Sequence, residues 1–163
     1  MKFWDVRHGH ILTQRAFGTQ TCGDSIDMHV DHHTFATGGG TGGEGLKIWD
    51  FRNTEHPVLN LAFSPGEKRD PWIEPFISGV RFIPKTNYII ATATDADYPT
   101  KIFNYQSGEL VHKFHNKCGR TTACDVVPSD GLLLSIGDET GQTTIITKES
   151  SHSVAKTKKD KDK

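Results

Sequence analysis

Residues 47–52 read KIWDFR, and this short stretch decides the fold. A close copy, KFWDVR, occupies residues 2–7, and weaker copies occur at residues 101–105 (KIFNY) and 144–147 (TIIT). Each copy is rich in β-branched and aromatic residues, which favour strands. The sequence therefore predicts one type of strand that recurs four times.

The spacing of the copies predicts what lies between them. Trp4 and Trp49 are 45 positions apart, Trp49 and Phe103 are 54 apart, and Phe103 and Ile146 are 43 apart. A period near 40–45 residues is the size of one four-stranded propeller blade. The wider middle interval contains an insertion of about ten residues, at positions 64–75.

Strand-sized segments fill each interval. Residues 88–94 (YIIATAT) form a nearly continuous apolar or β-branched run, typical of a strand covered on both faces. Residues 57–63 and 78–83 alternate apolar with polar or small side chains, and turn residues such as 128–131 (PSDG) separate the segments. The sequence predicts an all-β chain of thirteen strands, in groups of two, four, four and three.

With these tryptophan–acid pairs at this period, the chain resembles the WD-repeat family of β-propellers. The resemblance covers residues 1–149 and implies four-stranded antiparallel blades near residues 1–17, 25–63, 76–115 and 120–148. It also implies that one aromatic–polar pair ends the third strand of a blade. These structural repeat residues are Trp4, Asp5, Trp49, Asp50, Phe103 and Asn104.

The chain departs from the family pattern at one point. The family often places Gly-His before the first strand of a blade, where the histidine joins a hydrogen-bond network with the tryptophan indole. No Gly-His precedes Ile26, Val80 or Ala123. If Trp49 is buried, its indole N–H needs another acceptor.

The strand count predicts an incomplete or open propeller, because a closed one needs at least four full blades. Three explanations stay open. The chain is a fragment of a longer propeller, a partner or a second copy completes the ring, or the two end groups meet in one composite blade. An open arc exposes strand edges and apolar faces that favour association.

Composition and charge restrict the function classes. Twenty acidic and 19 basic residues give a net charge of −1, so no global field recruits nucleic acid or anionic lipid. No apolar run is long enough for a membrane span, the start lacks a secretory pattern, and Cys22, Cys118 and Cys124 make no paired framework. These features favour a reducing compartment, and the resemblance implies the cytoplasm, with the nucleus as the alternative.

The last segment, residues 150–163 (SSHSVAKTKKDKDK), differs from the rest. Five lysines and two aspartates give it a formal charge of +3, and it has almost nothing to bury. It is predicted to be a disordered tail.

Motifs for chemistry are weak. His29, His32 and His33 lie near Asp27, Asp31 and Cys22, but residues 31–33 are read as a polar turn between strands rather than a zinc site. The glycine-rich residues 38–45 precede a strand and lack the lysine of a phosphate-binding loop. No nucleophile motif occurs. We expect no metal, no cofactor and no enzymatic activity.

The long connection at residues 64–75 is the strongest candidate for binding, because long loops on rigid scaffolds often carry function. It contains a tryptophan flanked by charges, a composition common at interfaces. The resemblance places this loop on one face with the other loops that enter first strands. The candidate protein-binding residues are Lys68, Arg69, Trp72, Asp24 and Arg120.

These observations favour a non-enzymatic protein-interaction scaffold that binds a protein or peptide through loops on one face. Two alternatives remain. One is a nucleic-acid-binding module that uses the basic tail with Arg120, and the near-neutral charge argues against it. The other is a fragment of a longer propeller without a function of its own.

Overall fold

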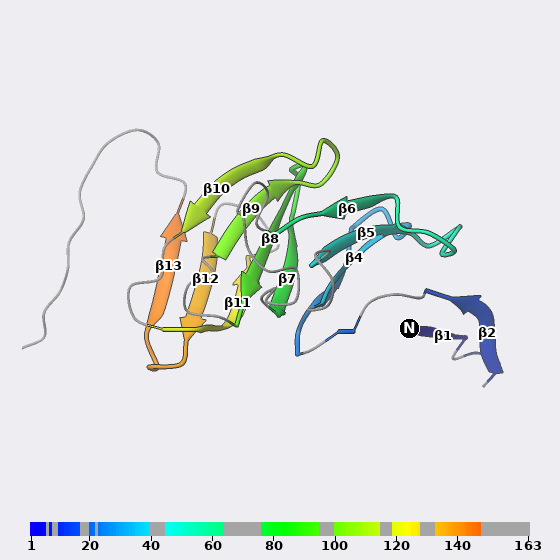
Figure 1. Cartoon of the computed structure of the whole chain (residues 1–163), viewed down its shortest axis with the longest axis horizontal. Helices are drawn as coiled ribbons and strands as arrows, with labels where there is room; N and C mark the ends of the chain where they lie inside the picture. The colour runs from blue at the N-terminus through cyan, green and yellow to red at the C-terminus, as the bar shows by residue number, and fades with distance from the viewer. Residues whose placement is uncertain are drawn as a thin grey trace, which may run out of the picture.

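The computed structural model describes thirteen strands and no helix within the residues that it places (Figure 1). The described residues are 1–5, 7, 10–16, 20–21, 23–39, 45–63, 76–94, 100–114, 119–127 and 133–147. Within them, no helix is long and apolar enough to cross a membrane.

The strands form four antiparallel meanders, in which each strand pairs with its neighbour in the sequence. The bounds are β1 Lys2–Asp5, β2 His10–Arg15, β3 Ile26–Met28, β4 Thr34–Gly38, β5 Leu46–Asp50, β6 Leu59–Leu61, β7 Ile77–Ile83, β8 Tyr88–Ala93, β9 Thr100–Asn104, β10 Leu110–Phe114, β11 Thr121–Val126, β12 Leu133–Asp138 and β13 Thr143–Thr147. We number the sheets in chain order: sheet 1 is β1–β2, sheet 2 is β3–β6, sheet 3 is β7–β10 and sheet 4 is β11–β13.

The all-β class and the four-stranded antiparallel sheets are confirmed. The grouping into two, four, four and three strands is also the one that the sequence predicted, for the described residues. These sheets close into neither a barrel nor a ring, so a complete propeller is not observed (Figure 1).

The core lies between consecutive sheets. One apolar cluster joins sheets 2 and 3 and includes Ile48, Val80 and Phe103, and a second joins sheets 3 and 4 and includes Ile102 and Ile136. The strands β7, β8 and β9 of sheet 3 are covered on both faces, which is why the continuous apolar run of β8 is buried from its second residue to its last. Each sheet therefore depends on its neighbour for a dry face.

The first strands of sheets 2, 3 and 4 lie beside one another. β7 packs against β3 on one side and β11 on the other. Just before β3, the Asp24 N–H donates to the Ser78 carbonyl at 3.0 Å, and the Val80 N–H donates to the Asp24 carbonyl at 3.2 Å. This short parallel bridge fixes sheet 2 against sheet 3.

Trp49 has the acceptor that the sequence required. Its side chain is 1% exposed, and its indole N–H donates to the Thr37 hydroxyl on the neighbouring strand at 2.9 Å. The ring also stacks on Phe35, with 5.9 Å between the ring centroids. Phe103, also 1% exposed, occupies the matching position in sheet 3.

The polar member of each pair holds the turn after the third strand. The Asp50 carboxylate accepts from the Arg52 N–H at 2.9 Å, and the Asn104 side-chain oxygen accepts from the Gln106 N–H at 2.9 Å. Aspartate and asparagine share this turn geometry, so Asn104 replaces the aspartate without loss of the bond.

Trp4 differs from Trp49, although the two match in sequence. It is 56% exposed, and Asp5 after it is the last residue of β1. Phe3, the residue before Trp4, packs on sheet 2, and its ring centroid is 5.6 Å from that of Phe35. Successive side chains of a strand point to opposite faces, so Trp4 points away from sheet 2. The expectation that Trp4 is equivalent to Trp49 therefore holds for the sequence position and not for burial.

Candidate protein-interaction site

The predicted binding residues fall into two groups. Lys68, Arg69 and Trp72 lie outside the described residues. Asp24 and Arg120 are both exposed, but they contact different elements. Asp24 pairs with Arg81 on β7, whereas the Arg120 N–H donates to the Glu139 carboxylate at 3.2 Å, on the turn between β12 and β13.

Arg81 lies where three sheets meet. Its guanidinium donates to the Asp24 carboxylate and carbonyl from before β3, and Nε is 3.5 Å from the Asp125 carboxylate on β11. Burial lowers the pKa of Arg81, but the hydrogen bond and the charge of Asp24 outweigh burial and raise the pKa above its usual value. This cation therefore ties the segment before β3 of sheet 2 to the first strands of sheets 3 and 4.

A cavity of about 440 Å³ opens beside Arg81, at the ends of the first strands. We call it the Arg81 groove. Its lining is mostly apolar with two carboxylates: Asp27, Met28, His29, Val30, Arg81, Phe82, Pro84, Asp125 and Val126. A second hollow of about 310 Å³ continues from it and shares Arg81 and Asp125.

The groove has exposed apolar surface on one wall. Met28 is 49% exposed and Val30 is 72% exposed, although both are large apolar residues. Asp27 lies beside β7, which forms the other wall of the groove. Its carboxylate accepts from the Phe82 N–H of that strand at 2.8 Å. Asp24, Asp27 and Asp125 outnumber the one guanidinium, so the groove and its continuation carry a formal charge of −2 when His29 is neutral. The lining thus offers apolar contact and negative charge together.

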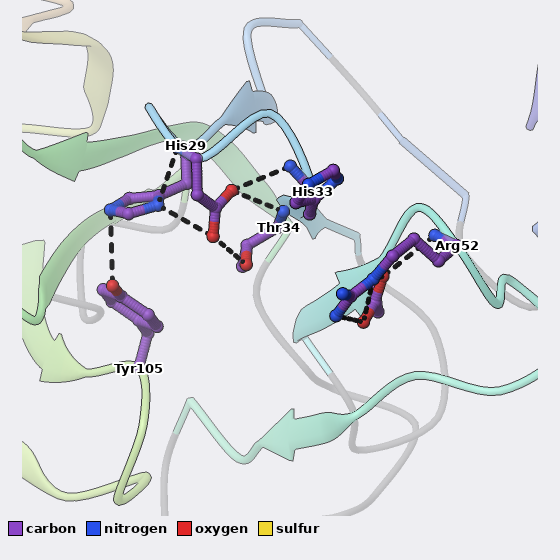
Figure 2. A network of polar contacts seen from close by, with 7 residues as sticks. His29, His33, Thr34, Arg52 and Tyr105 are labelled. Atoms are coloured by element: carbon purple, nitrogen blue, oxygen red, sulfur yellow. Dashed lines mark hydrogen bonds and ion pairs between the residues drawn. The ribbon is translucent and has the colours of Figure 1, made fainter.

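A polar network holds the His29 wall of the groove in place (Figure 2). The His29 ring has Nε2 3.3 Å from the Tyr105 hydroxyl and Nδ1 3.2 Å from the Asp31 carboxylate (Figure 2). The His29 ring also meets the Phe82 ring edge to face, with 5.2 Å between the ring centroids. Because Phe82 lies on β7 and Tyr105 directly follows β9, the histidine fastens the end of β3 to sheet 3.

Asp31 organises the turn on which His29 lies. Its carboxylate accepts from the backbone N–H groups of His33 and Thr34, each at 2.8 Å, and from the Thr34 hydroxyl at 2.7 Å (Figure 2). Burial raises the pKa of Asp31, but these hydrogen bonds outweigh burial and hold the pKa well below its usual value. The predicted polar turn at residues 31–33 is confirmed.

The pKa shifts in this region favour the uncharged forms of Tyr105 and Cys124. Burial, helped by the charge of Asp31, raises the pKa of Tyr105, which opposes its use as a base. In the described part of the chain, no group of three histidine, cysteine or acidic residues could hold a metal ion. Cys124 is buried, and burial raises the pKa of its thiol to about 11, which disfavours the thiolate form.

Comparison with known proteins adds no family. A scan against protein-family models found no match, and a search of the curated proteins found none either. The WD-repeat resemblance stays a prediction from the repeat residues.

Sequence reasoning missed the Arg81 groove, although a signal was present. The first strands of sheets 2, 3 and 4 carry one charged residue each among apolar or small neighbours: Asp27 in IDM, Arg81 in ISGVRFI and Asp125 in TTACDV. A charge in such a strand is rarely buried without a partner. Three of them, one in each first strand, indicate a shared polar site once these strands are placed side by side.

Proposed function

We propose that this chain is a non-enzymatic protein-interaction scaffold of the WD-repeat type, and that it acts in the cytoplasm. The repeat of four-stranded antiparallel sheets supports the scaffold assignment, because stacked sheets hold their connecting segments in fixed positions. The observation that carries the binding assignment is the Arg81 groove, with its apolar wall and its two carboxylates.

The groove indicates the chemistry of the partner. An anion would meet Asp27 and Asp125, and Arg81 is already paired with Asp24. A lysine or arginine of a peptide would place its aliphatic part on Met28 and Val30 and its charge near the carboxylates. The partner is therefore a protein segment that presents a basic residue beside apolar ones.

Selection from a random peptide library displayed on phage, with the full chain as bait, tests this proposal. Enriched peptides should carry a lysine or arginine next to apolar residues. The affinity of such a synthetic peptide should fall about fivefold for Asp27→Asn, because Asp27 is half-buried and its ion pair with the peptide is partly desolvated. It should fall only about twofold for Asp125→Asn, because the Asp125 side chain is 76% exposed and solvent screens its charge.

Glu55→Gln is the matched control, because it removes the same charge from the exposed turn between β5 and β6. It should leave peptide affinity unchanged. Enrichment of acidic peptides, or equal losses for all three variants, would refute the assignment of the groove.

A further inference from the structure

Consecutive sheets of this chain meet through one repeated pair of positions. The pair lies on the strand that carries the repeat, which is β1 in sheet 1 and the third strand in each other sheet. One residue of the pair faces the following sheet, and the next residue faces the preceding sheet. The residues that face the following sheet are Phe3, Ile48, Ile102 and Ile145, and those that face the preceding sheet are Trp4, Trp49, Phe103 and Ile146.

The three internal junctions use these positions in the same way. Phe3 of sheet 1 and Trp49 of sheet 2 share one apolar cluster. Ile48 and Phe103 share the cluster between sheets 2 and 3, and Ile102 and Ile146 share the cluster between sheets 3 and 4.

Two positions of this series have no counterpart among the described residues. Ile145 is 64% exposed, whereas its equivalents Ile48 and Ile102 are 3% and 9% exposed. Trp4 is 56% exposed, whereas its equivalents Trp49 and Phe103 are each 1% exposed. Ile145 lies on the face where a following sheet would pack, and Trp4 lies on the face where a preceding sheet would pack.

The face around Ile145 is shaped to receive a side chain. A hollow of about 170 Å³ is lined by Val127, Leu133, Ser135 and Ile145 together with residues 125 and 126. Val127 and Leu133 are each 37% exposed. This combination of neighbouring exposed apolar residues on a sheet face is typical of an interface.

We propose that a second copy of this chain covers both faces, with Ile145 of each copy against Trp4 of the other. The contact continues a junction that the chain already makes three times, which is the reason to choose a second copy over an unrelated protein. Because the two faces differ, each junction is head to tail, and two such junctions close a ring of two copies with overall two-fold symmetry. Two copies supply eight sheets, which is within the range of four to eight blades found in closed propellers.

The experiment is native mass spectrometry or sedimentation equilibrium on the 163-residue chain and its variants. The chain of 18.1 kDa should form a species of about twice that mass. Ile145→Lys alone and Trp4→Glu alone should each yield monomers. Val58→Lys, at a site that is 68% exposed on another part of the surface, is the matched control and should stay dimeric.

Mixing the two monomeric variants gives the sharpest test. In a head-to-tail pair, one junction joins the new lysine to the new glutamate and the other keeps the native Ile145 and Trp4, so the mixture should recover the dimer. A symmetric contact of Ile145 with Ile145 predicts no such recovery. Monomeric native protein at about 100 µM, open-ended oligomers, or variants that do not complement each other overturn the proposal. Asp125 lines both this hollow and the Arg81 groove, so the peptide test is kept separate by Asp27→Asn, since Asp27 lines the Arg81 groove alone of the two.

Discussion

The two middle sheets and the two end sheets share a sequence pattern but differ in what covers them. In sheets 2 and 3, the third strands β5 and β9 are buried along four of their five residues. In sheet 4, the equivalent strand β13 is exposed at four of its five residues, although all five are β-branched residues suited to a strand. The repeat therefore specifies the strand, and the neighbouring sheet and the fourth strand determine its burial.

The largest expected effect separates Trp49 from Trp4. Trp49→Ala should lower the free energy of unfolding by about 3–5 kcal/mol, because it leaves a cavity in the core and removes the ring from Phe35. Urea unfolding followed by circular dichroism measures the change. A loss below about 1 kcal/mol would show that Trp49 is not a core residue.

Trp4→Ala is the partner measurement, made at a dilution where the chain is monomeric. With 56% of the side chain exposed, the expected loss is below about 1 kcal/mol. Equal losses for the two tryptophans would contradict the difference between middle and end sheets.

The next effect tests the contact between sheets 2 and 3. A Cβ on Gly38 would lie 2.4 Å from Cγ2 and 2.8 Å from Cβ of Ile77, so β4 approaches β7 too closely for a side chain at this position. Gly38→Ala should destabilise the fold by about 1–3 kcal/mol through overpacking. Thermal unfolding by calorimetry provides the comparison with the native chain.

Gly137→Ala in sheet 4 is the matched control. The nearest atom to its added Cβ is the Thr122 hydroxyl oxygen at 3.9 Å, an ordinary contact distance. The stability of the Gly137→Ala variant should be unchanged or slightly raised, because alanine restricts the unfolded chain more than glycine does. If Gly137→Ala destabilised the fold more than Gly38→Ala does, the inferred close approach of β4 to β7 at Gly38 would be wrong.

A smaller effect tests the acceptor of the Trp49 indole. Thr37→Val keeps a β-branched residue of similar size in β4 but removes the hydroxyl that accepts from the indole N–H. The buried donor is then unsatisfied, and the expected loss is about 1–2 kcal/mol.

A double-mutant cycle with Trp49→Phe isolates that hydrogen bond. Since phenylalanine has no N–H, the further change Thr37→Val should cost less in the Trp49→Phe background than in the native chain. Additive losses in the cycle would show that the hydroxyl stabilises the fold in another way.

The comparison also shows which features the sequence could predict. Strand class and turn positions follow from local patterns, such as the apolar run of β8 and the Asp50 and Asn104 turns. The need for an acceptor at Trp49 follows from the chemistry of the indole, but Thr37 as the acceptor depends on strand register. Strand class and turn positions can be predicted because each depends only on the residues of one strand or one turn.

The Arg81 groove and the exposure of Trp4 could not be derived in that way. Asp27, Arg81 and Asp125 are far apart in the sequence, and only the packing of three first strands brings them together. The exposure of Trp4 depends on a sheet that the described residues do not supply. Both features depend on how the sheets pack against one another. The residue pattern within a single strand does not specify that packing.

The smallest expected effect concerns the turn at Asp31, which fastens sheet 2 to sheet 3 through His29. The pKa of Asp31 is lowered in the folded chain, so near pH 3 the unfolded chain binds more protons than the folded one. The stabilisation by this carboxylate is therefore complete above its ordinary pKa near 4 and declines as the pH falls below that value.

Asp31→Asn should lower the free energy of unfolding at pH 7 by less than about 1 kcal/mol, because solvent screens this exposed turn. The difference between the variant and the native chain, measured by urea unfolding, should shrink when the pH is lowered to about 2.5. A difference that is the same at both pH values would mean that the charge of Asp31 does not hold the turn, and that the contacts of His29 with Phe82 and Tyr105 fasten the two sheets without it.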